Sequence, residues 1–224
     1  FLCRVPEGGV RNRYLCFNQG KLVGRHDKDY PTMWESAFYE GGDSDDTGIV
    51  GNINGFRVGS AVCWEFLRAG TSRRLRNKVD VIIGGSHWWS TPTNWPVWLQ
   101  NMLEPTNKKN SIETVQDTAR LIGAPIIYAS HCNDFSCKIP GLPLTYQGFL
   151  EGNTAIVDAK GNVVASRRKE EGAGLVIAEL ELGAVEPMTE VPNRFWLRNR
   201  GLLPAFSWHY HGALGRRWYK KHIR

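Results

Sequence analysis

The stretch VGSAVCWEFLRAG, residues 58–70, places a cysteine between a run of small residues and a segment rich in helix formers. The small residues predict a closely packed strand over residues 56–62, so Cys63 stands where that strand ends. A turn at this point can expose the sulfur, and a following helix N-terminus lowers the pKa of a thiol. Cys63 therefore has two interpretations: a buried core cysteine, as free cysteines often are, or a nucleophile.

Strand and helix patterns alternate on both sides of Cys63. Short apolar runs bounded by turn residues predict buried strands, and Gly-containing turns between β-rich runs predict hairpins. A helix is expected over residues 110–122, because Asn110 and Glu113 form a capping-box pattern and Gly123 supplies a stop. This alternation indicates an α/β layered fold. The other predicted elements are hairpins over 12–25 and 48–62, a helical segment over 65–78 that Gly70 weakens, strands over 79–86 and 124–130, a hairpin over 152–166 and a final strand over 174–182.

The composition is typical of a single folded domain. The chain has 224 residues, 42% of them hydrophobic, which is enough for a full core. It contains no apolar run of about 18 residues that could span a membrane, and its N-terminus lacks the pattern of a signal peptide. The five cysteines are an odd number and widely scattered. We therefore expect a reduced, cytoplasmic environment.

Two of the cysteines lie close to a histidine in the sequence HCNDFSC, where Cys132 and Cys137 follow His131. A structural zinc site needs four ligands in a tetrahedral arrangement, and this segment has no second pair to complete one. We interpret it as an ordinary loop and expect no bound metal.

The positive charge is concentrated at the C-terminal end. Residues 194–224 hold eight of the 28 Lys and Arg and no acid, which leaves 20 bases against 22 acids in residues 1–193. Aromatic residues are interleaved with this charge, a combination that can bind nucleic acid through phosphate contacts and stacking. The alternative is an arm that packs its aromatics on a neighbouring subunit and leaves its charges in water. We favour the arm, because no recognised nucleic-acid motif accompanies the charge.

Two residues upstream of Cys63 have the chemistry to support a thiol nucleophile. Lys28 follows a predicted strand, and Glu35 comes soon after it in the sequence PTMWE. An ammonium group near a thiolate stabilises both that anion and a tetrahedral intermediate, while a nearby carboxylate keeps the lysine charged. The backbone N–H of Trp64 is suited to an oxyanion formed when the sulfur attacks a carbonyl or nitrile carbon. For Lys28 alone, an ordinary surface position is the alternative.

Several segments together resemble the nitrilase superfamily of carbon-nitrogen hydrolases, over about residues 5–185. They are GRHDKDYPTMWE, GFRVGSAVCWE, VDVIIGGSHWW, GNTAIVDAKGNVVAS and GLVIAELEL, and the Cys-Trp-Glu element is the most specific. The resemblance implies an αββα sandwich, a homodimer or larger homo-oligomer, and a reaction without a metal or organic cofactor. It also implies a catalytic glutamate, lysine and cysteine in that chain order.

The resemblance carries over to individual residues of this sequence. It implies that Cys63 is the nucleophile, that Lys28 is the catalytic lysine, and that Glu35 is the second glutamate of the family. Glu65 is expected to hold the local loop by hydrogen bonds rather than to carry protons. The substrate-side residues implied are Trp64, through its N–H, with His87 and Trp88 after the next strand. The tryptophans at 88, 89, 95 and 98 either line an apolar pocket or serve packing.

The chain departs from the family pattern at the general base. That glutamate is expected far upstream of the lysine, and only 27 residues precede Lys28. Glu7 is the one glutamate there, and its spacing fits a later family segment better. We therefore interpret residues 1–193 as an N-terminally incomplete carbon-nitrogen hydrolase domain, lacking the first strands and helices of the sandwich, followed by the basic aromatic arm at 194–224.

Two functions from different classes follow. The leading hypothesis is a thiol hydrolase that cleaves a non-peptide carbon-nitrogen bond in a small amide or nitrile through a thioester or thioimidate acyl-enzyme. The alternative is a non-catalytic fragment or degenerate member retained for assembly, because without a base the thiol is poorly deprotonated. A weaker third hypothesis makes the arm a nucleic-acid-binding or anion-binding element; a membrane partner is not expected.

Overall fold

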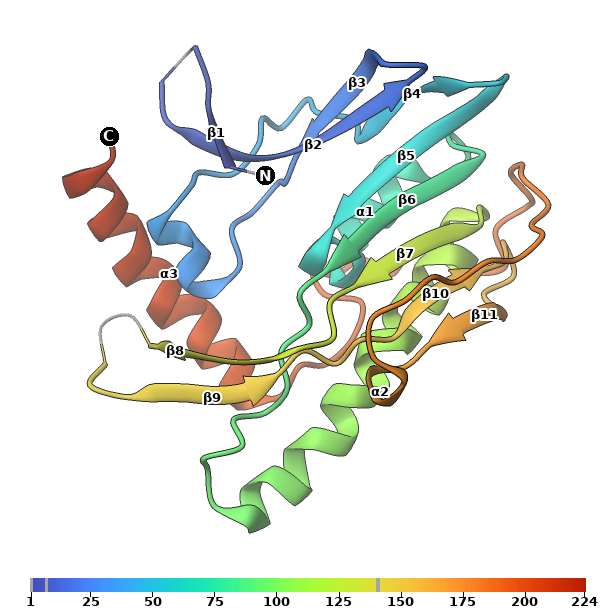
Figure 1. Ribbon diagram of the computed structural model, residues 1–224. Helices are drawn as coiled ribbons and strands as arrows, with labels where there is room; N and C mark the ends of the chain where they lie inside the picture. Colours follow the sequence, from blue (N-terminus) through green and yellow to red (C-terminus); the bar gives the residue numbers. More distant parts are fainter. Residues whose placement is uncertain (1, 7, 140–141) are drawn as a thin grey trace.

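A six-stranded sheet forms the centre of the molecule in the computed structural model, which describes residues 2–6, 8–139 and 142–224. Its strand order is β11-β10-β7-β6-β5-β4 (Figure 1). The three inner strands β5, β6 and β7 run parallel, and the outer pairings are antiparallel. The strands are β4 (Ile49–Ile53), β5 (Phe56–Val62), β6 (Val81–Ser86), β7 (Ile126–Ser130), β10 (Thr154–Val157) and β11 (Val163–Arg167).

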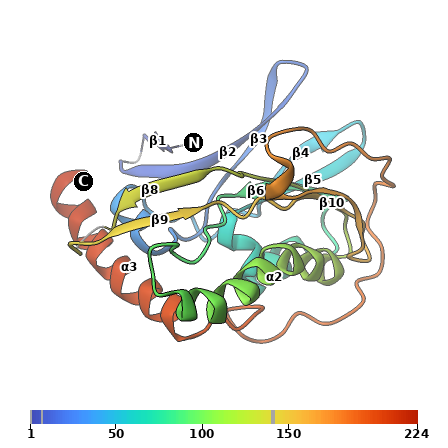
Figure 2. The same cartoon turned by 60° about the horizontal axis from the view of Figure 1, so that its bottom comes forward.

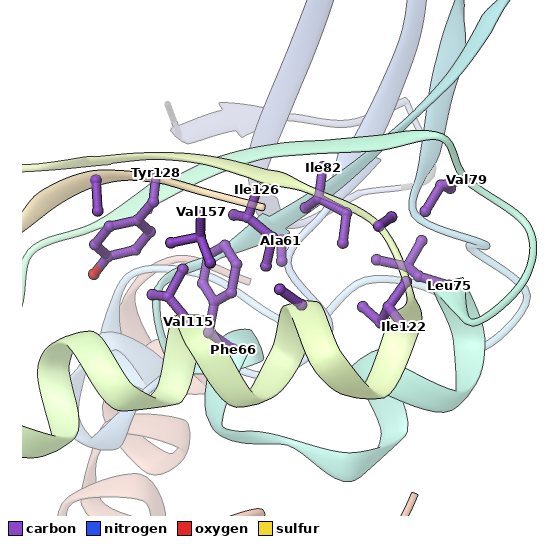
Figure 3. Close-up of a cluster of buried hydrophobic side chains, with 13 residues drawn as sticks. Ala61, Phe66, Leu75, Val79, Ile82, Val115, Ile122, Ile126, Tyr128 and Val157 are labelled. Atoms are coloured by element: carbon purple, nitrogen blue, oxygen red, sulfur yellow. The ribbon is translucent and has the colours of Figure 1, made fainter. Parts of the chain in front are cut away.

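Two helices, α1 (Ala69–Leu75) and α2 (Val97–Ile122), cover one face of this sheet (Figures 2 and 3). The main hydrophobic core lies between them and the strands. Ile82 and Ile126 from the sheet and Ile122 from α2 are fully buried there, and Phe66 packs edge-on against Tyr128. Burial of these side chains is the main stabilising contribution to this layer.

A second, smaller sheet covers the opposite face. Its order is β1-β2-β3, with β1 (Leu2–Arg4), β2 (Val10–Asn18) and β3 (Lys21–Asp27) all antiparallel. Cys16 packs against Val50, Val58 and Val81 between the two sheets. The approach is close at Gly24, where a Cβ atom would lie 2.1 Å from the carbonyl oxygen of Val50. The helix, sheet, sheet layering confirms the α/β sandwich expected from the sequence.

The remaining elements surround one end of the sheet. The ribbon of β8 (Asp134–Lys138) and β9 (Thr145–Phe149) and the long C-terminal helix α3 (Leu202–His222) lie there (Figures 1 and 2). The 3-10 helices are η1 (Met33–Ala37), η2 (Cys63–Leu67) and η3 (Lys169–Glu171). The helix α3 packs against η1 of its own chain, and the expected packing on a neighbouring subunit stays a prediction. None of the helices in the described ranges has the length and apolarity needed to cross a membrane.

Most predicted strands and turns are confirmed, and the hairpin at Asn54 and Gly55 is the clearest case. Both residues have positive φ, 53° and 88°, as a type I′ turn requires. The helical segment over 65–78 is also present, but in two pieces, η2 and α1, which are separated by the extended backbone of Arg68.

The predicted start of the second helix is wrong. The helix α2 begins at Val97 rather than near residue 110, so Asn110 lies in its interior and does not form the expected capping box with Glu113. Pro105 lies inside the helix, and its presence hid the upstream turns from the sequence pattern. The predicted stop is confirmed, because Gly123 adopts the left-handed conformation with φ 77°.

The predicted final strand over 174–182 does not form. The segment is extended, and its residues alternate between exposed and half-buried, but it has no ladder partner among the described residues. Leu175 and Ile177 are 85% and 84% exposed. Apolar and polar residues alternate in this segment as they do in a strand. A strand also needs a neighbouring strand to pair with its backbone N–H and C=O groups, and the local sequence does not determine that neighbour.

We expect Ile82→Ala to lower the free energy of unfolding by about 2–5 kcal/mol, because it opens a cavity in the buried core. The matched control Ile177→Ala removes the same atoms from an exposed side chain and is expected to cost less than about 0.5 kcal/mol. Urea unfolding of the two variants measures the difference, and equal losses would contradict this assignment of the core.

Candidate active site

Three parallel strands bring their carboxyl ends together at one edge of the sheet. Cys63 directly follows β5, His87 directly follows β6 and His131 directly follows β7. This edge is where α/β sheets carry their sites, because the loops leaving parallel strands converge there. Cys63 has φ 57°, in the left-handed region, so the chain turns sharply from β5 into η2 at this residue. A non-glycine residue held in this region stores about 1–3 kcal/mol of strain.

The sulfur of Cys63 receives hydrogen bonds from the backbone N–H groups of Trp64 and His87. Burial raises the pKa of the Cys63 thiol, and the positive charge of Lys28 and the two N–H groups oppose this only in part. The thiol is therefore protonated in the resting site at neutral pH. The Trp64 N–H, expected from the sequence, thus acts on the sulfur together with the N–H of His87, a residue that the sequence indicated only through its side chain.

Lys28 follows β3 and is completely buried, which excludes the surface alternative. Its Nζ donates to Thr32 Oγ1 at 2.9 Å, to Tyr39 Oη at 3.0 Å and to the carboxylate of Glu35. Burial alone would lower the pKa of Lys28, but the charge of Glu35 and its hydrogen bond outweigh burial, so the pKa of Lys28 is raised. The lysine is a fixed cation beside the thiol.

Glu35 lies on η1 and holds the lysine in place. Its Oε2 accepts the Lys28 contact, the hydroxyl of Tyr39 and the backbone N–H of Thr32 at 2.6 Å. Burial disfavours the carboxylate, yet the contact with Lys28 lowers the pKa of Glu35. Thr32 and Tyr39 were missed from the sequence. The T-x-x-E spacing of Thr32 and Glu35 is a capping-box signal that could have identified the first, and Tyr39 follows Glu35 by four residues.

Glu65 connects the cysteine turn to the lysine loop. Its fully buried carboxylate accepts the backbone N–H of Val62 at 2.7 Å and that of Asp29 at 3.1 Å. Val62 directly precedes Cys63, and Asp29 directly follows Lys28. The expected role of Glu65 in holding the local loop is therefore matched by the geometry, which extends that role to both sides of the site.

His26 supplies the positive charge that balances Glu65. Its Nε2 lies 2.9 Å from Glu65 Oε2, and its Nδ1 lies 2.9 Å from Asp46 Oδ1. Burial alone would lower the pKa of His26, but hydrogen bonds and charge from Asp46 and Glu65 outweigh it and raise the pKa to about 9. His26 lies two residues before Lys28, so an imidazolium anchors the same strand that delivers the lysine. The sequence reasoning missed His26 and Asp46.

The expected substrate-side residues differ in their surroundings. The exposed His87 side chain packs edge-on against His131, with ring centroids 3.8 Å apart. Partial loss of hydration and the nearby charge of His131 lower the pKa of His87, although the charge of Glu35 opposes them. Trp88 is buried, and its indole N–H donates to Asn107 on α2 at 3.0 Å, which favours packing over the expected substrate contact. Trp89 packs at 4.8 Å from Trp34, the neighbour of Glu35.

Two further expectations from the sequence concern a metal site and an upstream general base. The described ranges contain no cluster of three His, Cys, Asp or Glu side chains arranged for a metal, and His131 contacts His87 instead. Glu7, the candidate for an upstream general base, lies outside the described residues.

The comparisons with known proteins point to one family. The family model for carbon-nitrogen hydrolases matches residues 7–190. A search of curated proteins finds no significant match. Among solved structures, a carbon-nitrogen hydrolase from Helicobacter pylori G27 superimposes with a TM-score of 0.62 at 16% identity, over 80% of this chain and 59% of that one.

Two other solved structures show the same fold. Glutamine-dependent NAD+ synthetase from Acinetobacter baumannii matches with a TM-score of 0.58 at 15% identity, over 99% of this chain and 37% of that one. A variant of the amidase from Nesterenkonia sp. AN1, with an acetamide moiety attached covalently at its active-site cysteine, matches with a TM-score of 0.53 at 14% identity, over 86% and 62%. The chain thus spans between 37% and 62% of the length of these structures.

The charge of His26 predicts a pH-dependent stability. Its folded pKa of about 9 lies above the ordinary value of 6.5, so the contribution is complete below pH 6.5 and is lost as the pH rises through 9. This shift corresponds to a contribution on the order of 3 kcal/mol. We expect His26→Gln to be much less stable than the wild type at pH 6 and close to it at pH 10. The exposed His209 provides the control His209→Gln, and urea titrations at both pH values measure the gap. If His26→Gln loses the same stability relative to the wild type at pH 6 and at pH 10, His26 acts only by packing.

Proposed function

The chain belongs to the carbon-nitrogen hydrolase family, and we propose that it cleaves a non-peptide carbon-nitrogen bond of a small amide or nitrile with Cys63 as the nucleophile. The observation that carries this proposal is the environment of one sulfur atom. Two backbone N–H groups and the charge of a buried lysine converge on Cys63. These are the groups that a thiolate and a developing oxyanion both require.

In the proposed reaction, the Cys63 thiolate attacks the substrate carbon and the carbon-sulfur bond forms. With an amide, the carbonyl oxygen gains negative charge, which the N–H groups of Trp64 and His87 and the ammonium of Lys28 stabilise. The carbon-nitrogen bond then breaks, and ammonia or an amine leaves after taking up a proton. Water attacks the resulting thioester, releasing the acid and returning the thiol. With a nitrile, the first adduct is a thioimidate. One water adds to its carbon and ammonia leaves, which gives the same thioester, and a second water hydrolyses this thioester to the acid.

Glu35 has two parts in this scheme. Its Oε2 is occupied by Lys28, Tyr39 and Thr32, which keeps the lysine oriented and charged. Its Oε1 has no hydrogen-bond partner within the described ranges and is the oxygen open to exchange a proton with the thiol or with water. The lowered pKa of Glu35 keeps this carboxylate ionised at neutral pH.

An amide is the first substrate to test. The Nesterenkonia amidase carries an acetamide moiety on its cysteine, and the Acinetobacter synthetase is glutamine-dependent. These two solved structures are similar to this chain in fold. The proposed substrate class therefore rests on the chemistry proposed for Cys63 and not on that similarity.

One observation favours a second candidate function, a non-catalytic protein retained for assembly. Lys28 and Glu35 neutralise each other's charge in an ion pair, and the pKa of the Cys63 thiol is raised rather than lowered. A thiol that stays protonated reacts slowly with an amide. The two candidates predict different results for the same variants.

We expect Cys63→Ala to abolish hydrolysis and to lose the iodoacetamide label carried by Cys63, because it removes the atom that forms the bond to substrate. Release of ammonia from a panel of short amides and nitriles measures turnover, and intact-mass analysis after treatment with iodoacetamide measures labelling. Cys132→Ala, a change at another half-buried cysteine, is the control and should retain turnover. Turnover that persists in Cys63→Ala would refute the assignment, and a wild type inactive on every substrate would favour the assembly function.

Lys28→Met is expected to reduce kcat/KM by about 100-fold or more, as loss of a group that stabilises the oxyanion does in other hydrolases. Lys78→Met, at an exposed lysine, is the matched control and should leave the rate unchanged. Steady-state kinetics on the best amide provide the measurement. A Lys28 variant that folds and turns over like the control would remove Lys28 from the mechanism.

A further inference from the structure

The two elements that carry the proposed catalytic residues are short. Glu35 lies on η1 and Cys63 begins η2, and each is a 3-10 helix of five residues. Such helices have few internal hydrogen bonds and owe their position to what packs against them. In this molecule, one continuous segment from Phe195 to Tyr219 packs against both.

The first part of this segment holds η2. The backbone N–H of Leu197 donates to the carbonyl of Leu67 at 2.8 Å, and the N–H of Ala69 donates to the carbonyl of Phe195 at 3.0 Å. The segment is thereby fixed to the backbone that leaves the cysteine turn, four residues after Cys63.

An aromatic and cationic cluster covers Trp64, the residue next to the nucleophile. The Trp64 ring stacks on Trp208 at 5.8 Å with an interplanar angle of 10°, and meets Trp196 edge-on at 5.7 Å. The Arg200 guanidinium lies 3.5 Å from the Trp196 ring centroid and 4.9 Å from that of Trp64. Cation-π contacts of this kind contribute more when they are shielded from water. The orientation of the Trp64 backbone N–H is thus tied to residues more than 130 positions away.

The second part of the segment, within α3, holds η1 (Figure 1). Its inner face is buried at His211, Gly212, Gly215 and Tyr219. The approach is closest at Gly215, where an added Cβ atom would lie 2.8 Å from the backbone nitrogen of Ala37 and 3.0 Å from the carbonyl carbon of Ser36.

The residues around this close approach add further contacts to η1. His211 packs edge-on against Trp34 at 5.4 Å, and Ser207 Oγ contacts Met33 Sδ at 3.2 Å. The helix therefore lies directly on the turn that positions Glu35.

Two of the four arginines of the segment, Arg198 and Arg200, and Arg224 beyond it make contacts within the chain. Arg198 pairs with Glu113 at 2.5 Å and with Asp117 at 2.6 Å on α2, and Arg224 pairs with Glu40 at 3.2 Å. Arg200 stacks on tryptophan. These contacts hold part of the positive charge of residues 194–224 within the chain.

We propose that residues 195–219 form a positioning element that sets the distance between Cys63 and the Lys28–Glu35 pair by holding η1 and η2 on one surface. This inference rests on the proposed function for its catalytic consequence, but not for its effect on the Cys63 thiol. If the segment sets that distance, displacing it weakens the influence of the Lys28 charge on the thiol.

The experiment compares two glycine substitutions in the same helix. Gly215→Ala places a methyl group against the backbone of η1, whereas Gly212→Ala places one 3.1 Å from the Nη1 of Arg216, a flexible side chain that can move. Alanine favours a helix over glycine in both cases, so intrinsic helix stability is matched. The rate of Cys63 alkylation by iodoacetamide is measured from pH 6 to 10 in the full chain, with circular dichroism as the check on folding.

We expect Gly215→Ala to slow alkylation at neutral pH by about tenfold, through a rise of about one pH unit in the apparent pKa of the Cys63 thiol. On the best amide, kcat should fall by at least a similar factor, with KM changed by less than about threefold, because a displaced catalytic group affects the reacting geometry first. Gly212→Ala should match the wild type in both assays. A Gly215→Ala variant that folds and keeps the wild-type alkylation profile would overturn the proposal.

A second variant covers the case in which Gly215→Ala does not fold. Arg200→Met removes the guanidinium over Trp64 and Trp196 while keeping an unbranched side chain, and it should raise the apparent thiol pKa in the same direction. Arg200→Lys keeps the charge and should restore part of the effect. Unchanged profiles in both Arg200 variants would also overturn the proposal. If no amide or nitrile is hydrolysed by the wild type, the proposed function fails, while the alkylation profiles still decide whether the segment positions the thiol.

Discussion

A buried carboxylate with no contact to solvent is the constraint around which this molecule is organised. Glu65 is 0% exposed, and a charge in such a place is tolerated only when donors surround it. Here His26, Arg74 and two backbone N–H groups supply them. Because each donor comes from a different part of the chain, satisfying one carboxylate fixes the relative positions of β3, β5, η2 and α1. Removing it would leave a buried imidazolium and several N–H groups without partners at once.

One charged pair holds the site in place, and a different charged pair has a part in the proposed reaction. The His26–Glu65 pair carries one charge of each sign and contacts the backbone on both sides of the site, while Lys28 and Glu35 form a second neutral pair. The site therefore contains several ionised groups with little net charge. A site with little net charge is compatible with the proposed neutral substrate, an amide or nitrile. Such a substrate does not depend on electrostatic attraction to reach the site.

The sequence allowed the prediction of features that depend on local spacing. The turn at Asn54 and Gly55, the strand ending at Cys63 and the stop at Gly123 each follow from a few adjacent residues. Lys28, Glu35 and Cys63 were selected by type and order, and the structure brings their charges within range of one another. His26 could not be selected in this way, since its partner lies 39 positions along the chain. The segment over 174–182 fails for a related reason: alternation describes a strand, whereas pairing depends on a neighbour supplied elsewhere.

The order of elements along the chain has a consequence for how the protein is made. A ribosome completes β3, η1 and η2 long before it reaches Trp196, Trp208 or Gly215, so the thiol of Cys63 emerges without the surface that later covers its turn. Contacts between positions so far apart in sequence form late, because the loop that separates them must first be ordered. During synthesis the turn at Cys63 is therefore made well before the segment over residues 195–219 that packs on it. Release of the chain before Trp196 would leave the turn at Cys63 without the aromatic residues that cover Trp64.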